Sequence, residues 1–453
     1  MILPLCKSCA LITQLEPDQR EVVNEEYKCV LCFGILSNLE FRKQIVKEVG
    51  EKFKSSGYDG WSVVLAINSP ITLLLREVIM SSLFGDVWNA REMSAKNLFS
   101  NLLQKDIEIG TELKGSLSSN LTLTISIENE EFDESDMAYL TTNFLKHFMH
   151  RKRKGNNDNN TLKSLYTRVK IQEIVSSMTK ELAGKYKFLS PSKLPGFSIS
   201  FERESIYIGG RYCKFSRALP QSAWTCDPDI PVVEGNSVSE KITAPMVKYF
   251  KASGTRFISS GREDIDVKML GNGRPFAVNL INAKLYECLH GAEKHETLKR
   301  IQDEINKNTD IYVSDLFQLN LYQAEKLNNE EEEKRKYYSA LCYSTVPVTK
   351  EMLKRLEESA PVTIQQDTVI RVLKRRPLHT RPRDIYKIRA FQMDDYHFML
   401  KLETQAGTYI KEFVHGDLNR TTPSVGELLG VGADKVDILE LDVEAVDLEW
   451  PPK

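Results

Sequence analysis

Two aspartates, Asp264 and Asp266, are the first residues of this sequence that could do chemistry. They alternate with apolar residues and precede the glycine-containing stretch 271–273 and a second apolar run, 276–278. The alternation predicts a strand, and the glycines predict a hairpin turn. On a strand the two carboxylates would share one face. A solvated hairpin with surface charges is the alternative. Stretch 271–273 lacks the helix start and the Gly-Lys-Ser/Thr of a phosphate-binding loop, so it is not read as a nucleotide site.

Two Cys-x2-Cys pairs near the N-terminus have the spacing of a structural metal site. The pairs are Cys6 with Cys9 and Cys29 with Cys32. Each pair lets a tight turn direct two thiolates at one ion, and four thiolates complete a tetrahedral shell around Zn²⁺. A redox pair or plain buried cysteines are the alternatives. A closed shell leaves no open coordination position, so we expect one zinc with a structural role. No organic cofactor is expected.

Two stretches mix basic and aromatic residues in a way that suits RNA. The first, 209–217, contains Arg211 and Arg217 among aromatic rings, which fits phosphate contacts combined with base stacking. The second, 371–389, holds eight basic residues and one acid: Arg371, Lys374, Arg375, Arg376, Arg381, Arg383, Lys387 and Arg389, with Asp384. Such a local excess in a chain of net charge −2 predicts a phosphate-binding surface. An aromatic core strand and a solvated strand pair are the respective alternatives.

Three separated motifs resemble those of pseudouridine synthases. They are Gly-Arg-Glu-Asp-Ile-Asp-Val at 261–267, Lys-Tyr-Tyr-Ser-Ala-Leu at 336–341 and Gly-Thr-Tyr-Ile-Lys at 407–411. With the cysteine pairs, the sequence is most similar to the archaeal and eukaryotic tRNA pseudouridine synthases that carry an N-terminal zinc ribbon and a THUMP-type extension. The Gly-Gly-Arg-Tyr motif at 209–212 also matches, although Phe215 stands where that family has a second tyrosine.

The resemblance implies a catalytic set of Asp264, Tyr338 and Lys411. Asp264 would act at the sugar, either by attacking C1′ or by taking a ribose proton. Lys411 would supply the positive charge that keeps Asp264 ionised in a cleft. Tyr338 would stack on the base and assist loss of the C5 proton; without the resemblance it would be read as a half-buried strand tyrosine.

The resemblance also names a substrate. It implies that uridine becomes pseudouridine in the TΨC loop of tRNA, at positions 54 and 55, after the base is flipped out of its stack. Arg262, Arg371, Arg375, Arg376 and Tyr409 join Arg211 and Arg217 as expected RNA contacts.

The resemblance implies a mixed α/β (α+β) chain in three parts. It implies a zinc ribbon at 1–37, a THUMP-type accessory RNA-binding domain at 38–190, and a catalytic domain at 191–453 with a bent, mainly antiparallel sheet. Helical spacing at 39–53 and 73–84, a buried strand at 61–67 and period-two alternation at 121–127 support the accessory domain. The breaker-rich stretch 190–196 sets the boundary.

Composition is that of an intracellular globular protein, with 41% apolar and 27% charged residues. We expect neither a secretory signal nor a membrane span. We expect a nuclear or cytoplasmic location, because eight cysteines in 453 residues do not suggest a disulfide framework. tRNA is the expected partner, without a membrane, and the oligomeric state is left open with a monomer as the working expectation.

Two rival functions follow from the same residues. A non-catalytic RNA-binding scaffold would keep the cysteines and basic stretches but would not need Asp264, Tyr338 and Lys411 together. A metal pair or a glycosidase dyad would use Asp264 and Asp266, yet no third ligand follows at useful spacing.

Overall fold

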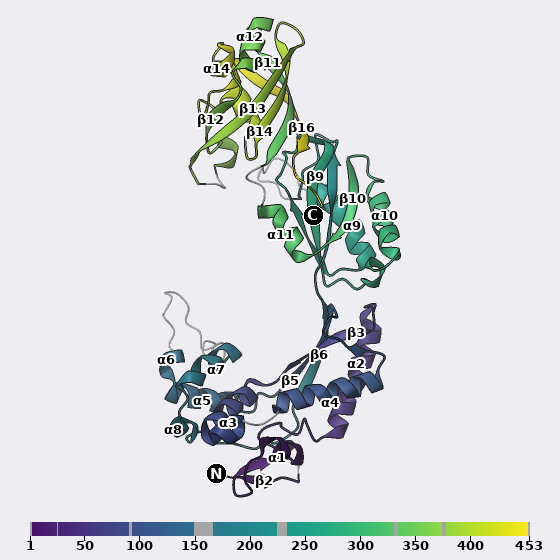
Figure 1. The fold of residues 1–453 in the computed structure, drawn as a ribbon, viewed down its shortest axis with the longest axis vertical. Coiled ribbons are helices and arrows are strands. Elements are labelled where there is room, and N and C mark those ends of the chain that lie inside the picture. The colour runs from purple at the N-terminus through teal and green to yellow at the C-terminus, as the bar shows by residue number, and fades with distance from the viewer. Residues whose placement is uncertain are drawn as a thin grey trace. The chain divides into compact units, whose positions relative to one another are not determined.

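The structure is a computed structural model that describes residues 2–24, 26–89, 93–148, 166–223, 233–329, 334–373 and 377–451. The chain divides into two compact units, Met1–Glu204 and Ser205–Lys453 (Figure 1). This division lies beyond the predicted boundary at residue 190. The reason is that strand β6, Gly196–Arg203, pairs with β5, Leu121–Glu128, and so belongs to the first unit.

The first unit places helices against a four-stranded sheet of order β4-β3-β5-β6. Its predicted elements are confirmed at 39–53, 61–67, 73–84 and 121–127. Helices α2 and α4 begin at side-chain caps from Asn38 and Ser94. The elements other than β5 and β6 are α2 (Leu39–Ser56), β3 (Ser62–Asn68), α3 (Ile71–Asn89), α4 (Ala95–Gly110), β4 (Lys114–Gly115), α5 (Asp133–Asn143), α6 (Leu145–Phe148), α7 (Arg168–Ile174) and α8 (Lys180–Ala183).

The cysteine-bearing segment shares a hydrophobic core with the rest of this unit. It contains β1 (Leu3–Leu5), α1 (Lys7–Thr13) and β2 (Arg20–Val22). All four cysteines are buried in one apolar cluster with residues of α2, α4, β3 and β5. The buried Arg76 of α3 adds a polar link, because its guanidinium donates to the carbonyls of Val30 and Leu189, each at 2.9 Å.

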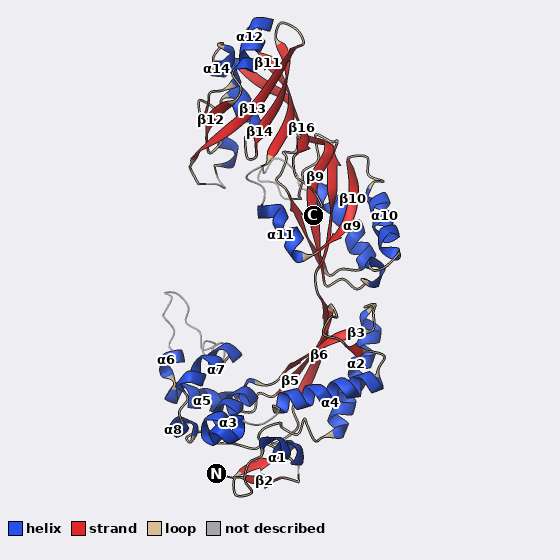
Figure 2. Cartoon of the chain, viewed as in Figure 1, coloured by secondary structure: helices blue, strands red, loops and turns tan. Residues whose placement is uncertain are grey.

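The second unit is built on one ten-stranded sheet, drawn red in Figure 2. Its order is β10-β7-β9-β16-β11-β14-β13-β12-β15, with β8 paired to β9. Among the described pairings of this ten-stranded sheet, only the short one between β9 and β16 is parallel. The prediction of an α+β fold with a mainly antiparallel sheet is confirmed. The strands are β7 (Ile206–Lys214), β8 (Gly254–Ser259), β9 (Lys268–Ile281), β10 (Ile311–Leu319), β11 (Arg335–Ser344), β12 (Val362–Asp367), β13 (Thr380–Gln392), β14 (His397–Gln405), β15 (Thr421–Thr422) and β16 (Val436–Val446).

The predicted hairpin around Gly271 and Gly273 is wrong. β9 continues through both glycines, and Asp264 and Asp266 lie in the loop before it, not on a strand. Both glycines have positive φ, and a Cβ on Gly271 would lie 2.0 Å from the carbonyl oxygen of Glu444 on β16. The glycines therefore let β9 bend where it leaves β16 and pairs with β7.

Helices pack on both halves of this sheet. α9 (Val238–Phe250), α10 (Glu293–Ile305) and α11 (Leu321–Asn329) lie with the β7–β10 half, and α12 (Lys350–Glu358) packs on β13 (Figure 1). α13 (Ile410–His415) and α14 (Val425–Leu429) are short, and Ser424 caps α14 with a complete capping box. In the described ranges, no helix is both long and apolar enough to cross a membrane.

Candidate active site

A cleft of about 570 Å³ opens where the two halves of the large sheet meet. Asp264, Tyr338 and Lys411 all line it, although about 70 residues separate each from the next in the sequence. Asp264 comes from the loop before β9, Tyr338 from β11 and Lys411 from α13. The Nζ of Lys411 lies 3.5 Å from Oδ2 of Asp264. The fold thus brings the predicted trio to one place.

Arg371 approaches Asp264 more closely than Lys411 does. Its Nη1 donates to Oδ2 of Asp264 at 2.6 Å, a shorter contact than that of Lys411. The side chain of Asp264 is 39% exposed, so water reaches the carboxylate. We expected Arg371 to contact RNA phosphate. Its position beside Asp264 could not be foreseen, because Arg371 lies outside the three motifs that carry the resemblance.

Lys411 makes its shorter contacts with Asp266. Its Nζ donates to both carboxylate oxygens of Asp266, at 2.8 and 2.7 Å. Burial works against ionisation of Asp266, but these hydrogen bonds prevail and lower the pKa of that carboxyl group. Lys411 therefore bridges two carboxylates and faces Asp264 at the longer distance.

Tyr338 is nearly buried on β11, with 8% of its surface exposed. Burial raises the pKa of its phenol to about 12. The phenol therefore stays neutral near pH 7, so it offers a flat apolar face and an O–H group to a ligand in the cleft.

A buried ion pair holds the loop that carries Asp264 from within the core. Nε of Arg274 lies 2.9 Å from Oε2 of Glu263, and both side chains are almost fully buried. The hydroxyl of Tyr212 donates to the same carboxylate at 2.9 Å, and Gln221 reaches that hydroxyl at 2.7 Å. Glu263 is thus a core residue rather than a surface charge. If either side chain moved away, the other would remain as an unpaired buried charge. The ion pair therefore stabilises this conformation of the loop.

Lys214 supports the same loop through its backbone. This lysine at the end of β7 is fully buried. Its Nζ donates to the carbonyls of Leu219, Asp264 and Ile265 at 2.9, 2.9 and 2.8 Å. Burial lowers the pKa of the ammonium group to about 8. Two of the three acceptors belong to Asp264 and its neighbour Ile265.

Arg211 and Arg217 make contacts within the protein. Arg211 donates to the carbonyls of Gly273, at 3.1 Å, and of Leu448. Arg217 donates to the Asp266 carbonyl at 3.0 Å and pairs with two carboxylates of β16 at 2.7 Å. Both arginines therefore tie the loop that carries Asp264, or β9, to neighbouring chain segments, a role that the basic–aromatic pattern did not predict.

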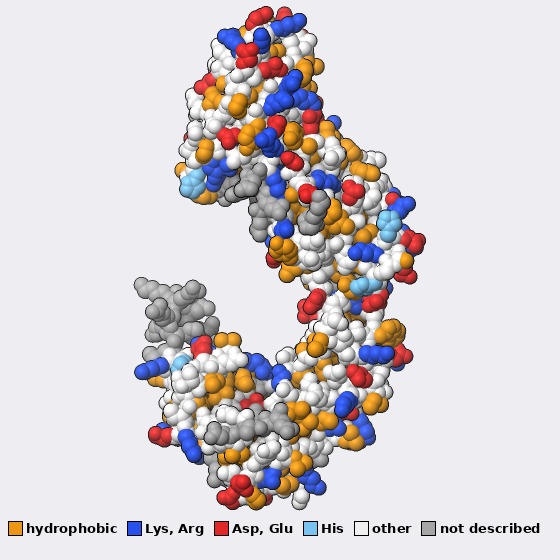
Figure 3. Space-filling model, viewed as in Figure 1, with side chains coloured by type: hydrophobic (Ala, Val, Ile, Leu, Met, Phe, Trp, Pro, Cys, Tyr) orange, Lys and Arg blue, Asp and Glu red, His pale blue; other side chains and the backbone are white. Residues whose placement is uncertain are grey.

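Other expected RNA contacts lie at the cleft. Arg262 and Tyr409 line it, together with Arg381 and Arg383 of the basic stretch. The guanidinium of Arg371 lies 5.3 Å from the centroid of the Tyr409 ring. Arg375 and Arg376, like Lys374, fall outside the described residues. On the face drawn in Figure 3 basic and acidic side chains are interspersed, so any RNA-binding surface there is local.

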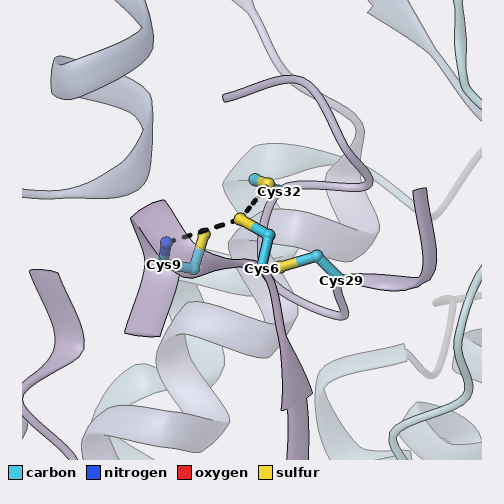
Figure 4. Close-up of side chains that lie close together, drawn as sticks. All are labelled: Cys6, Cys9, Cys29 and Cys32. Atoms are coloured by element: carbon cyan, nitrogen blue, oxygen red, sulfur yellow. Dashed lines mark hydrogen bonds between the residues drawn. The ribbon is translucent and has the colours of Figure 1, made fainter. Parts of the chain in front are cut away.

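The four cysteines of the first unit converge on one point, as Figure 4 shows. Their Sγ atoms all lie within 4.8 Å of one another, and Sγ of Cys6 is 3.6 Å from Sγ of Cys32. A tetrahedral Zn–S₄ shell with bonds of 2.3 Å places sulfurs about 3.8 Å apart. The backbone N–H of Cys9 points at Sγ of Cys6 at 3.4 Å, as in metal knuckles that stabilise thiolates. The group can hold a metal ion.

Comparison with known proteins places this architecture in a family. A family model of the Pus10 C-terminal region matches residues 207–447, and a model of the eukaryotic Pus10 N-terminal region matches 29–204. The chain belongs to the Pus10 family. The two matched ranges meet where the compact units divide, so each unit corresponds to one region of that family.

Curated relatives extend the match along nearly the whole chain. The tRNA pseudouridine synthase Pus10 of Mus musculus is 35% identical over 445 residues, which cover 94% of this chain and 79% of that protein. Its counterpart in Pyrococcus furiosus is 36% identical over 251 residues, or 54% of this chain and 60% of that protein. A solved pseudouridylate synthase is similar at 11% identity and a TM-score of 0.21, covering 61% of this chain and 86% of that one, which is too slight to support an argument.

Sequence reasoning missed the residues that hold the site together. Glu263, Arg274, Lys214 and Glu412 are buried charged groups, and nothing in composition or periodicity distinguishes them from surface charges. One signal was available. Glu263 directly precedes Asp264 in the most distinctive motif, and its charge has no evident partner in the local sequence.

Proposed function

We propose that this chain is a tRNA pseudouridine synthase, an isomerase that detaches a uracil base from C1′ of its ribose and rejoins it through C5. The observation that carries the proposal is the convergence of Asp264, Tyr338 and Lys411 on one cleft in a member of the Pus10 family. The N1–C1′ bond breaks, a C1′–C5 bond forms, C5 loses its proton, and N1 gains one. The reaction has no net redox change, so it requires no organic cofactor.

Asp264 is the residue that acts at the sugar. Its carboxylate is exposed enough to meet a ribose and has two neighbouring cations, Arg371 and Lys411. It can attack C1′ directly or take a ribose proton, and the geometry of the protein is compatible with both. The target uridine must leave its stack to enter the cleft. Tyr338 then offers its ring to the base as a neutral phenol.

The substrate proposed is the TΨC loop of tRNA, at uridines 54 and 55. The printed names of the relatives support tRNA, and the choice of loop follows from the family resemblance. Arg262, Arg381 and Arg383 are proposed to meet the phosphates around the flipped nucleotide, because they line the cleft beside Asp264.

The deciding experiment is incubation with an unmodified tRNA transcript followed by mapping of pseudouridine. We expect pseudouridine in the TΨC loop with the parent protein and none with Asp264→Asn, while the variant binds tRNA within about tenfold of the parent, or roughly 1.4 kcal/mol. Binding without any conversion by the parent would favour the rival RNA-binding scaffold. Turnover by Asp264→Asn would remove the assignment of this carboxylate.

We further propose that Cys6, Cys9, Cys29 and Cys32 hold one structural Zn²⁺. The sulfur spacing and the all-thiolate donor set suit this ion, and a closed shell stabilises the fold without taking part in the reaction. Metal analysis should find one zinc per chain, lost in the double change of Cys29 and Cys32 to serine. The first unit of that variant should unfold at a lower temperature than the first unit of the parent protein. Zinc retained in the variant would refute the site.

The first unit is proposed to carry the THUMP-type RNA-binding function over residues 38–190, with the segment 1–37 as its zinc ribbon. The match to the N-terminal region of eukaryotic Pus10 supports a shared fold. A nuclear or cytoplasmic location and a monomeric state complete the proposal. Fractionation of cells and light scattering of the purified protein would test them.

A further inference from the structure

Arg371 lies between two carboxylates at the edge of the cleft. Its Nε donates to Oε1 of Glu412 at 2.6 Å, and its Nη1 donates to Oδ2 of Asp264 at 2.6 Å. Nη2 makes a longer contact of 3.4 Å with Oε2 of Glu412. One guanidinium thus joins a buried carboxylate to the catalytic one, using the fixed fork that makes arginine suited to such geometry.

The two carboxylates differ in their surroundings. The side chain of Glu412 is 3% exposed, against 39% for Asp264. Glu412 is on α13 directly after Lys411, and a buried carboxylate without a partner would cost several kcal/mol. Arg371 is therefore bound to Glu412 by necessity, whereas its contact with Asp264 reaches toward the open cleft.

The segment that carries Arg371 is also fixed. The backbone N–H of Ile370 donates to Oδ2 of Asp417 at 3.2 Å, and the guanidinium lies over the ring of Tyr409. Burial opposes the charge of Arg371, but Glu412 and Asp264 outweigh it and raise the pKa of the guanidinium, so the cation persists at every working pH.

Lys411 cannot take over this role at its observed position. Its ammonium is committed to Asp266 at 2.7 Å and lies 3.5 Å from Asp264. An ammonium is also a point charge that does not fix the plane of a carboxylate, whereas a guanidinium N–H has a set direction.

We propose that Glu412 positions Arg371, and that Arg371 in turn orients the carboxylate of Asp264 for attack or proton transfer. This inference rests on the proposed function. It assigns Glu412 as a positioning residue and changes the expected role of Arg371 from a phosphate contact to the orienting partner of the catalytic carboxylate.

The two roles for Arg371 predict different kinetics. If Arg371 contacts a phosphate, Arg371→Lys keeps the positive charge and should retain that contact. Removing the charge altogether would then weaken tRNA binding and flatten its salt dependence. An orienting role needs the guanidinium fork, so Arg371→Lys should lower the single-turnover rate at saturating tRNA. A carboxylate displaced by about 1 Å can lose up to roughly a hundredfold in rate.

The experiment measures single-turnover conversion and tRNA dissociation constants for Glu412→Gln and Arg371→Lys. We expect both to lower the rate at saturating tRNA at least roughly tenfold, with binding within about threefold of the parent. Matched controls are Glu358→Gln and Arg355→Lys on α12, which are exposed and do not line the cleft. Rates for Glu412→Gln equal to those of Glu358→Gln would overturn the proposal, as would a loss confined to binding.

A second set of variants separates positioning from folding. Replacing Glu412 by leucine and Arg371 by methionine together removes both charges of the pair and so avoids stranding either one, which generally preserves a fold. We expect this double variant to melt cooperatively and its single-turnover conversion to remain slow. In a protein that already carries Arg371→Met, we expect Glu412→Gln to lower the conversion rate little further. Additive losses would refute action through Arg371. If the parent itself converts no uridine, the proposed function fails instead.

Discussion

Lys214 gives the sharpest quantitative test of how the loop that carries Asp264 is held. The ammonium is fully buried, and each of its three hydrogen bonds ends on a backbone carbonyl. Burial lowers the pKa of this group from 10.5 to about 8, against the opposing pull of Glu263, Asp266 and Asp264. A difference of that size corresponds to about 3 kcal/mol in favour of the neutral amine.

The sign of the resulting pH dependence follows from proton binding. Between pH 8 and 10.5 the unfolded chain keeps the Lys214 proton while the folded chain has released it, so the free energy of unfolding rises with pH. The contribution grows through this window to about 3 kcal/mol and is absent below pH 8. Activity should change in the opposite direction. A neutral amine has two N–H donors for three carbonyls, so the loop loses one contact as pH passes 8.

The assay compares the parent with Lys214→Met by urea unfolding of the second unit at pH 7 and pH 10. The stability difference between the two proteins should shift by about 3 kcal/mol toward the parent at the higher pH. Single-turnover conversion by the parent should fall over the same interval. Lys299→Met, a change at an exposed residue of α10, is the control for losing any lysine. An unchanged stability difference, or parent activity that is flat to pH 10, would refute the reasoning.

Two further predictions concern the cations of the cleft. Lys411→Met should slow conversion by roughly fivefold, because a charge 3.5 Å from Asp264 contributes about 1 kcal/mol in water-like surroundings and Arg371 stays in place. Lys411→Arg should retain most activity. If Lys411→Met lost as much activity as an Asp264 variant, Lys411 would be indispensable and this estimate would be wrong. Reversing the charges of Arg381 and Arg383 should weaken tRNA binding and lower the slope of log K against log salt by roughly 0.7 to 0.9 per lost phosphate contact, whereas an unchanged slope would place the RNA elsewhere.

The parts of the fold that periodicity determines were predictable. The alternation of apolar residues at 121–127 indicates β5, and the helical spacing from Leu39 indicates α2, because each pattern matches one buried face. The stretch before β9 was assigned to a strand for the same reason, and this was wrong. Its alternating residues lie in a loop held by Lys214 and Glu263, so tertiary contacts, rather than local preference, set its conformation.

The candidate site was predictable in its members but not in its electrostatics. The three motifs identify Asp264, Tyr338 and Lys411, which the fold brings to one cleft. No spacing rule indicates that Arg371 approaches Asp264 more closely than Lys411 does, or that Glu412 is buried behind it. Such pairings depend on which side chains a sheet of ten strands brings together, and this information is absent from any short window of sequence.

The charges of the cleft explain how an acidic catalyst can work on a polyanion. Its lining holds seven basic residues and four acids, an excess of three in a chain whose net charge is −2. Each of three acids has a basic partner within 3 Å: Glu263 with Arg274, Asp264 with Arg371, and Asp266 with Lys411. These pairs are not isolated, because Arg371 also contacts the buried Glu412 and Lys411 also lies near Asp264. Each of the three carboxylates still has a cation beside it, which weakens its repulsion of an approaching phosphate, and Arg381 and Arg383 add positive charge to the same lining.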